Sequence, residues 1–358
     1  MFKWQRTHFI DEMIRHGIHF NIFNPLLFEN AEVANKNAVE KLRGGNFDLF
    51  MTNCCYHRML FPETLLEIRK MGIPTLSLRC DNLVIPFEDR VLAPLFDLIW
   101  LTAKETQHLY NKWGAKSVFA PYAANPYTFS YMKSEVLKRV SFIGRPYGSR
   151  SLMINTLTGA GVPLDLYCGG LSTHISNNDG FKVKYDAIHP GRVEVLISRM
   201  RFGEGRKVML GALVNKLKKG TTVNENQFLT KLPGVDPAEI SSYYSKYALS
   251  LASTSTSHTD SLSSPLKIVN LRNFEIPMSG GIEICKYNPE LAEYFEEGKE
   301  ILFYRSDEEL VEKAKHYTHS ASESEIYAIK NAARKRAESE HSWKNRFLLV
   351  FNTMGLKL

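Results

Sequence analysis

The sequence has little of several features that would settle its class at once. Its 358 residues include only five cysteines, and none shows the Cys-x-x-Cys or Cys/His spacing of a zinc site. An odd, scattered set of cysteines is typical of reduced thiols in a cytosolic protein. The longest apolar stretch, residues 91–103, is interrupted by Pro94 and Asp97, so it falls short of the roughly 18 apolar residues that a membrane span requires. Charges also interrupt the N-terminal segment, which predicts that it is no signal peptide. We expect a cytoplasmic protein, with contact at the inner face of the membrane as the alternative.

A second absence concerns metal chemistry. No Asp-x-Asp pair occurs anywhere in the chain, although carboxylates are the usual means of holding a metal ion on a nucleotide diphosphate. We therefore expect neither a metal nor a resident cofactor. The net charge of +7 and the isoelectric point near 9.0 favour anionic partners: nucleotide phosphates, an anionic membrane surface or nucleic acid. A solvated basic surface is the alternative explanation of this charge.

What the chain does contain is a regular alternation of strand-like and helix-like segments. Apolar, β-branched runs such as 75–79, 140–143 and 247–252 are separated by segments of helical periodicity such as 31–42. This alternation predicts an α/β fold of the doubly wound, Rossmann-like type. The length exceeds that of one ordinary core, so two such domains facing across a cleft are expected.

The domain boundaries follow from breaks in this alternation. We place a first domain at 1–125, a proline-containing linker at 126–139, a second domain at 140–335 and a C-terminal helix that crosses back to the first domain at 336–358. The chain opens almost directly in a predicted helix at 5–16, followed by a predicted strand at 18–23. The first strand of the first domain is therefore either missing or compressed into residues 2–4.

The most informative stretch is 264–304, which reads as a helix at 265–276, a Gly-Gly stop, a short buried strand and a second acidic helix. Ser264 is a good N-cap for that helix, and free N–H groups at a helix start bind anions. Lys267 and Glu275 would share one helical stripe about 12 Å long. A cation near the helix start and a carboxylate further along match a diphosphate followed by a ribose diol. Arg272 is a further cationic candidate, or it pairs with Glu275 at i+3.

A second anion-binding candidate is the loop at 144–150, which follows a strand and precedes a helix. Gly144 opens this loop, and Arg145 or Arg150 could hold a diphosphate through two hydrogen bonds. In the first domain, His57 and Asp81 follow strands, where side chains face the cleft. Either could act as a base for an acceptor hydroxyl, although a histidine after a strand is more often structural. The basic stretch 199–219 is either a solvated helix or an attraction site for a lipid phosphate or an anionic acceptor.

Several of these segments resemble the CgeB-like, spore-maturation type of glycosyltransferase. The resemblance rests on Phe-Glu-Ile-Pro-Met-Ser-Gly-Gly at 274–281, Tyr-Asn-Pro-Glu-Leu at 287–291, His-Ser-Trp at 341–343 and Ser-Phe-Ile-Gly at 141–144. It covers most of 97–170 and 236–346. It implies a GT-B fold, in which the second of two Rossmann-like domains holds a nucleotide sugar, and a likeness to family-4 retaining glycosyltransferases.

Family-4 glycosyltransferases carry a Glu-x7-Glu motif whose two glutamates contact the donor sugar and the ribose, and the resemblance implies a related motif in this chain. Glu275 and Glu283 have this spacing. Aligned on Gly280-Gly281, however, Glu275 takes the place of the second glutamate, which binds ribose, and Lys267 takes the place of the first. Glu283 then lies in the following strand and is expected to be structural. The departure at Lys267 puts the donor-sugar contact in question.

We therefore predict a metal-independent glycosyltransferase that moves a sugar from a nucleoside diphosphate, with UDP as the expected nucleotide, to an acceptor hydroxyl with retention. The acceptor, whether a glycan, a lipid-linked group or a protein, is left open. The alternative is an inactive GT-B module that binds a nucleotide or glycan. A sugar transferase acting on nucleic acid ranks third, because no basic stripe with stacked aromatics is present.

Overall fold

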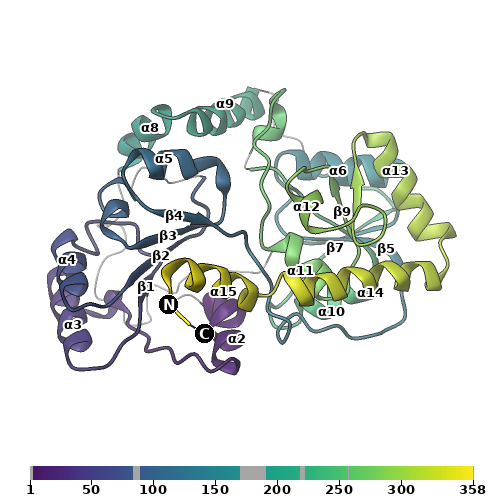
Figure 1. The fold of residues 1–358 in the computed structure, drawn as a ribbon. Coiled ribbons are helices and arrows are strands. Elements are labelled where there is room, and N and C mark those ends of the chain that lie inside the picture. The colour runs from purple at the N-terminus through teal and green to yellow at the C-terminus, as the bar shows by residue number, and fades with distance from the viewer. Residues whose placement is uncertain (1–2, 84–88, 170–190, 218–221, 257, 358) are drawn as a thin grey trace.

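The fold consists of two parallel sheets, each enclosed by helices (Figure 1). The computed structural model describes residues 3–83, 89–169, 191–217, 222–256 and 258–357. Within these residues the first sheet has four strands and the second has six. Both are wholly parallel, so the α/β prediction is confirmed.

The first sheet runs in chain order. Its strands are β1 (Phe50–Thr52), β2 (Thr75–Arg79), β3 (Leu98–Leu101) and β4 (Ser117–Phe119). The helices α3 (Ala31–Arg43), α4 (Pro62–Lys70) and α5 (Gln107–Lys112) lie between these strands in the sequence. β2 and β3 are fully buried, which explains why their sequences are continuous apolar runs rather than alternating ones.

The second sheet has the order β10-β9-β8-β5-β6-β7. The strands are β5 (Leu137–Ile143), β6 (Leu164–Tyr167), β7 (Leu229–Leu232), β8 (Tyr247–Leu251), β9 (Glu283–Lys286) and β10 (Leu302–Tyr304). The chain winds outward from β5 to β7, then returns to the other side of β5 with β8. The strand order therefore reverses between β5 and β8. In doubly wound sheets, ligands bind in the crevice at the carboxyl ends of the two strands where the order reverses.

Helices at both ends of the chain join the domains. An N-terminal helical segment comprises α1 (Lys3–Gln5), a π-helical turn (Arg6–Ile10) and α2 (Asp11–Arg15). The chain ends in α13 (Asp307–Lys315), α14 (Glu323–Glu340) and α15 (Trp343–Met354), and α15 lies against α2 (Figure 1). The Glu12 carboxylate accepts hydrogen bonds from the backbone N–H groups of Trp343 and Lys344, at 3.3 and 2.9 Å. A carboxylate of the N-terminal segment thus caps the last helix.

The largest hydrophobic cluster crosses the domain boundary. It joins Leu76 and Trp100 of the first sheet to Phe274 and Phe303 of the second domain through the aromatic side chains of Phe9, Trp343 and Phe347. Because both domains share this densely packed core, packing fixes the position of one domain relative to the other.

Two predicted elements differ from the structure. Residues 18–23 form no strand. The predicted helix 265–276 begins only at Arg272, as α11 (Arg272–Met278). Upstream of it, Ser255 and Lys267 form an antiparallel bridge, and the N–H of Ile268 donates to the carbonyl of Thr254 at 2.8 Å. Pairing to this neighbouring segment therefore satisfies backbone groups that a helix would have used.

The remaining helices complete the second domain. They are α6 (Ser149–Gly159), α10 (Ile240–Lys246) and α12 (Leu291–Tyr294). Two consecutive helices, α8 (Arg192–Met200) and α9 (Gly203–Leu217), lie between β6 and β7 in the sequence and are together called the hairpin below. In Figure 1 they follow one another along the upper edge of the molecule, with α8 above α5 of the first domain. Among the described residues, no helix combines the length and the apolar character that crossing a membrane would require.

Candidate functional site

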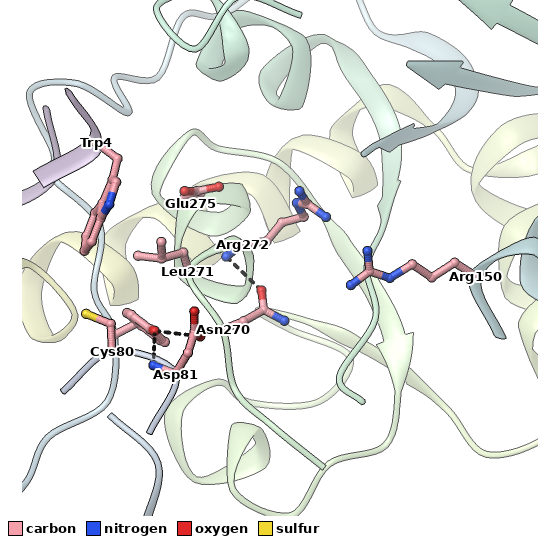
Figure 2. Close-up of a pocket in the computed structure, with 9 residues that line it drawn as sticks. Trp4, Cys80, Asp81, Arg150, Asn270, Leu271, Arg272 and Glu275 are labelled. Atoms are coloured by element: carbon pink, nitrogen blue, oxygen red, sulfur yellow. Dashed lines mark hydrogen bonds between the residues drawn. The ribbon is translucent and has the colours of Figure 1, made fainter. Parts of the chain in front are cut away.

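A cavity of about 400 Å³ opens between the two domains. The first domain and the N-terminal helix contribute Trp4, Cys80, Asp81 and Tyr122 to its lining, and the second domain contributes Arg150, Asn270, Leu271, Arg272 and Glu275 (Figure 2). The second-domain residues follow β5 and β8, so the cavity lies at the reversal of strand order. This is the position that a doubly wound sheet offers to a ligand.

Arg272 lies against the end of β5. A Cβ atom on Gly144, the residue directly after β5, would lie 3.2 Å from Nη1 and 3.3 Å from Nη2 of Arg272. Gly144 has a φ of 141°, a conformation that other residues rarely adopt. Glycine at this position therefore leaves room for the guanidinium to rest on the backbone. Burial would lower the pKa of Arg272, but the charges of Tyr244, Glu275 and Glu283 outweigh it and raise that pKa, so the side chain stays cationic.

The start of α11 fixes the direction of Arg272. The side-chain oxygen of Asn270 accepts a hydrogen bond from the Arg272 N–H at 3.0 Å, drawn as a dashed line in Figure 2. The Asn273 side chain in turn accepts from the Asn270 N–H at 2.8 Å. These two hydrogen bonds hold the backbone just ahead of α11, whose N-cap residue, Leu271, makes no side-chain cap hydrogen bond.

Arg150 is the second cation of the cavity. It lies on the first turn of α6, with its guanidinium carbon 4.3 Å from the centre of the Tyr147 ring. Burial lowers its pKa, and the nearby positive charge of Arg272 lowers it further. Neither arginine has a carboxylate within ion-pair distance among the described residues. Two cations on one cavity, neither of them in a direct ion pair among the described residues, favour an anionic ligand such as a diphosphate.

Glu275 is the carboxyl group on the second-domain wall. Its Oε1 atom lies 3.3 Å from Nε2 of His8, a residue of the N-terminal helical segment. Burial raises the pKa of Glu275 to about 7, a shift that the charge of Arg272 partly offsets, and burial lowers the pKa of His8 to about 4. Near neutral pH the imidazole is therefore uncharged. The alternative that Glu275 pairs with Arg272 at i+3 is not what the structure shows.

The first domain supplies the opposite wall. Asp81 follows β2 and has a positive φ of 54°, which aspartate tolerates better than most residues. The Tyr122 hydroxyl donates to Oδ1 of Asp81 at 3.0 Å and accepts from the Asp81 N–H at 3.0 Å (Figure 2). Burial and the charge of Asp81 raise the pKa of the Cys80 thiol to about 12, so it remains protonated and unreactive.

The structure brings together only part of the predicted set. Asp81, Arg150, Arg272 and Glu275 line the cavity and Gly144 supports Arg272. Arg145 and His57 are exposed and do not line it. Ser264 accepts a hydrogen bond from Lys207 at 3.3 Å and caps no helix.

Lys267 is the most informative of the displaced residues. It lies on the antiparallel bridge rather than on α11, and its ammonium donates to the carbonyl of Tyr287 at 3.0 Å. The predicted stripe shared with Glu275 is therefore wrong. Glu283 is buried in β9, where it accepts a hydrogen bond from Asn273 at 2.5 Å. It does not line the cavity, in agreement with its predicted structural place.

Sequence reasoning missed Trp4, Tyr122 and Asn270, which line the cavity, and His8, which contacts Glu275. Trp4 and His8 are four residues apart and so share a helix face, but that face reads as ordinary core. Tyr122 occurs in a Pro-Tyr-Ala turn with no ligand signal of its own. Asn270 could have been found as a capping residue two positions before the helix, had the helix start been placed correctly.

One protein family matches part of the chain, mostly within the second domain. Residues 215–351 match the protein family described as glycosyl transferase-like. This stretch contains α11, β9 and most of the second-domain wall of the cavity. The match agrees with the predicted glycosyltransferase class over these residues, and the CgeB-like subtype stays a prediction. No curated protein matches the chain by sequence.

Solved structures show the fold of the whole chain. The chain is similar to Alr3699/HepE of Anabaena, solved in complex with UDP and glucose, with a TM-score of 0.54, 12% identity and coverage of 97% of this chain and 89% of that one. It is also similar to a glycosyltransferase from Rickettsia africae, with a TM-score of 0.51, 12% identity and coverage of 96% of this chain and 87% of that one. For sucrose-phosphate synthase from Thermosynechococcus elongatus the TM-score is 0.50 and the identity 13%, with coverage of 90% of this chain and 78% of that one. At this level of identity the likeness shows the fold alone, and it confirms the GT-B prediction.

Proposed function

We propose that the protein transfers a sugar from a UDP-sugar to an acceptor hydroxyl, with retention and without a metal ion. The observation that carries this proposal is the convergence of Arg150, Arg272 and Glu275 on one interdomain cavity at the β5–β8 reversal. Two arginines suit a diphosphate, and a carboxylate suits a ribose diol. The family match over 215–351 supports the reaction class.

The diphosphate is assigned to the arginine pair. Arg272 presents its planar fork above Gly144, and Arg150 approaches from the first turn of α6 (Figure 2). When the bond between the sugar C1 and the phosphate oxygen breaks, negative charge develops on the leaving UDP. Two fixed guanidinium groups stabilise that charge in the place where other enzymes use a metal ion. This is the physical basis for proposing a metal-independent reaction.

The nucleoside is assigned to Glu275. An ionised carboxylate accepts two hydrogen bonds and so matches the 2′- and 3′-hydroxyls of ribose. Glu275 lies three residues after Arg272 on α11, so the ribose is assigned to Glu275 and the neighbouring diphosphate to Arg272. UDP is the proposed nucleotide because Alr3699/HepE of Anabaena has been solved with UDP, with UDP-glucose and with UDP and glucose.

The acceptor is assigned to the first-domain wall. Asp81 is held by Tyr122 through Oδ1, which leaves its second oxygen to accept a hydrogen bond from an acceptor hydroxyl. That oxygen positions the hydroxyl for attack on C1, and the proton passes to the departing phosphate oxygen on the same face. The new bond then forms on the face from which UDP leaves, which is retention.

One observation favours a second function, that of a catalytically inactive nucleotide-binding module. Lys267 occupies the place of the first glutamate of the Glu-x7-Glu motif, and its ammonium is committed to the carbonyl of Tyr287. No carboxylate therefore stands at that place to contact the donor sugar. Such a chain could retain nucleotide affinity through the arginine pair and Glu275 while losing turnover.

A donor screen separates the two functions. The full chain is incubated with UDP-, GDP- and dTDP-sugars in the presence of a chelator, with and without simple sugar acceptors, and released nucleotide and product are followed by mass spectrometry. We expect UDP release from a UDP-sugar, reduced in Asp81→Asn without loss of UDP binding. Binding of UDP without any turnover would favour the inactive module. Absence of binding to every nucleotide would overturn both assignments.

A further inference from the structure

The hairpin of α8 and α9 carries an arrangement of apolar side chains that the proposed transfer reaction does not explain. On α8, Val193, Leu196, Ile197 and Met200 follow the spacing i, i+3, i+4, i+7 and therefore share one face. Their exposed fractions lie between 48% and 69%. The same helix buries Ser198, which is only 9% exposed. The apolar face thus points outward and a polar residue points inward, the reverse of an ordinary surface helix.

The second helix of the hairpin repeats the pattern. Leu210, Leu213 and Leu217 of α9 lie on one face at i, i+3 and i+7 and are between 51% and 73% exposed. These seven exposed side chains, four on α8 and three on α9, are called the apolar stripes below. They are all aliphatic or methionine. Single exposed apolar residues are common, but two continuous stripes on adjacent helices mark an interaction surface.

The opposite faces of the hairpin are fixed to the body of the protein. Arg58 of the first domain forms an ion pair with Glu194 of α8 at 3.2 Å. Val208 of α9 lies in a buried cluster with Leu83 and Ala103 of the first domain and Leu266 of the second. The outward direction of the stripes is therefore set by contacts made on the other side of each helix.

The close approach of α9 to the second domain reinforces this placement. A Cβ atom on Gly211 would lie 2.8 Å from the carbonyl oxygen of His258, and the Ser261 hydroxyl donates to the Gly211 carbonyl at 3.2 Å. Only glycine permits backbone packing this tight. The hairpin cannot turn its stripes inward without losing these contacts.

The charge of the hairpin identifies what the stripes contact. Residues 192–217 contain six basic residues and two acidic ones, a net charge of 6 − 2 = +4 out of +7 for the chain. Arg201, Arg206 and Lys216 are exposed. An aliphatic stripe bordered by cations is the composition of helices that lie in the interface of an anionic bilayer. Lys218 and Lys219, which end the predicted basic stretch, lie outside the described residues.

We propose that the α8–α9 hairpin docks the protein on an anionic phospholipid bilayer. The stripes enter the boundary between headgroups and acyl chains, and the neighbouring arginines and lysines contact lipid phosphates. A second copy of the chain fits this surface poorly, because pairing two hairpins face to face would oppose their like charges. Nucleic acid also fits poorly, since aliphatic side chains offer no rings for base stacking. This inference does not depend on the proposed donor chemistry.

Vesicle sedimentation with the full chain tests the proposal. Vesicles of phosphatidylcholine alone are compared with vesicles that also contain phosphatidylglycerol, at low and at high salt. We expect binding to the anionic vesicles, weakened by salt, and little binding to the neutral ones. Leu196→Ser/Ile197→Ser should reduce vesicle affinity by about tenfold or more, because two apolar side chains no longer enter the bilayer.

Matched variants control for loss of folding. Leu152 and Leu349 are 51% and 47% exposed on α6 and α15, outside the hairpin, so Leu152→Ser and Leu349→Ser should leave vesicle affinity unchanged. UDP affinity should stay unchanged in the Leu196→Ser/Ile197→Ser variant, which separates this test from that of the donor site. Equal binding to neutral and anionic vesicles would overturn the proposal. Absence of binding to both kinds of vesicle would also overturn it. A dimer in analytical ultracentrifugation that Leu196→Ser/Ile197→Ser abolishes would overturn it as well.

Discussion

The pair of buried glutamates on either side of Gly280-Gly281 gives the sharpest prediction. Glu275 and Glu283 are eight residues apart, both are buried, and burial raises the pKa of each to about 7. Only Glu275 lines the cavity. Replacing each by glutamine keeps size and shape and removes the capacity to ionise. Glu283→Gln is therefore a control matched in burial, chemistry and position in the domain.

The expected effect concerns preference for ribose rather than affinity alone. A hydrogen bond to a charged group is worth about 1.5–3 kcal/mol, which corresponds to a factor of about ten to 150 in affinity. Wild-type protein should therefore bind UDP more tightly than 2′-deoxy-UDP. Glu275→Gln should reduce that preference several-fold, and Glu283→Gln should leave it unchanged. Calorimetry at roughly pH 8, above the pKa of Glu275, ensures that the wild-type carboxyl is ionised.

The result that would refute this reasoning is an unchanged preference for UDP over 2′-deoxy-UDP in Glu275→Gln. A loss of preference in Glu283→Gln alone would also contradict it, because it would restore the literal Glu-x7-Glu alignment. Circular dichroism of both variants distinguishes a change at the site from a failure to fold.

Three further predictions follow from the same contacts. Gly144→Ala should weaken UDP binding at least about tenfold in calorimetry, because the new Cβ displaces the Arg272 guanidinium. Gly298 also has a positive φ but has open space around it, so Gly298→Ala should leave UDP binding unchanged and cost only about 1–3 kcal/mol of stability in thermal unfolding. Arg150→Gln should weaken binding of UDP but not of uridine, and Arg145→Gln should change neither, measured by competition against a fluorescent nucleotide. Burial raises the pKa of Glu275 from 4.5 in the unfolded chain to about 7 in the folded protein, so its contribution to stability is complete below about pH 4.5 and is lost as pH rises through 7. Glu275→Gln has no such dependence. Between pH 5 and pH 8 its free energy of unfolding, measured by chemical denaturation, should therefore rise relative to that of the wild type by up to about 3 kcal/mol.

Much of the fold followed from the sequence because its signals were local. The strand at 75–79 has the predicted bounds, and the helix predicted at 31–42 begins at Ala31 and ends one residue later than predicted, at Arg43. Apolar runs, N-caps and glycine stops act within a few residues, so the chain displays them directly. The glycosyltransferase class rested on the block around Glu275, and the family match covers the same block.

The errors have a shared physical cause. Residues 264–270 carry good helix-start chemistry, yet they pair with 254–256, a tertiary contact that local propensity does not reveal. The helix start therefore moved from Pro265 to Arg272, and Lys267 left the site with it. Trp4 lines the cavity and His8 contacts Glu275 because the N-terminal helix packs against α15 at the domain interface, a contact that no local pattern records.

The central claim is that the interdomain cavity is a nucleotide-sugar site built on Arg272. The most direct measurement is a calorimetric titration of wild-type protein and Arg272→Gln with UDP, UMP and uridine. We predict one site per chain in the wild type, with affinity falling in the order UDP, UMP, uridine, and a variant that binds uridine as before but prefers UDP over uridine far less, because only Arg150 still faces the diphosphate. Equal affinity of the wild type for all three ligands, or an unchanged preference for UDP in Arg272→Gln, would contradict the account.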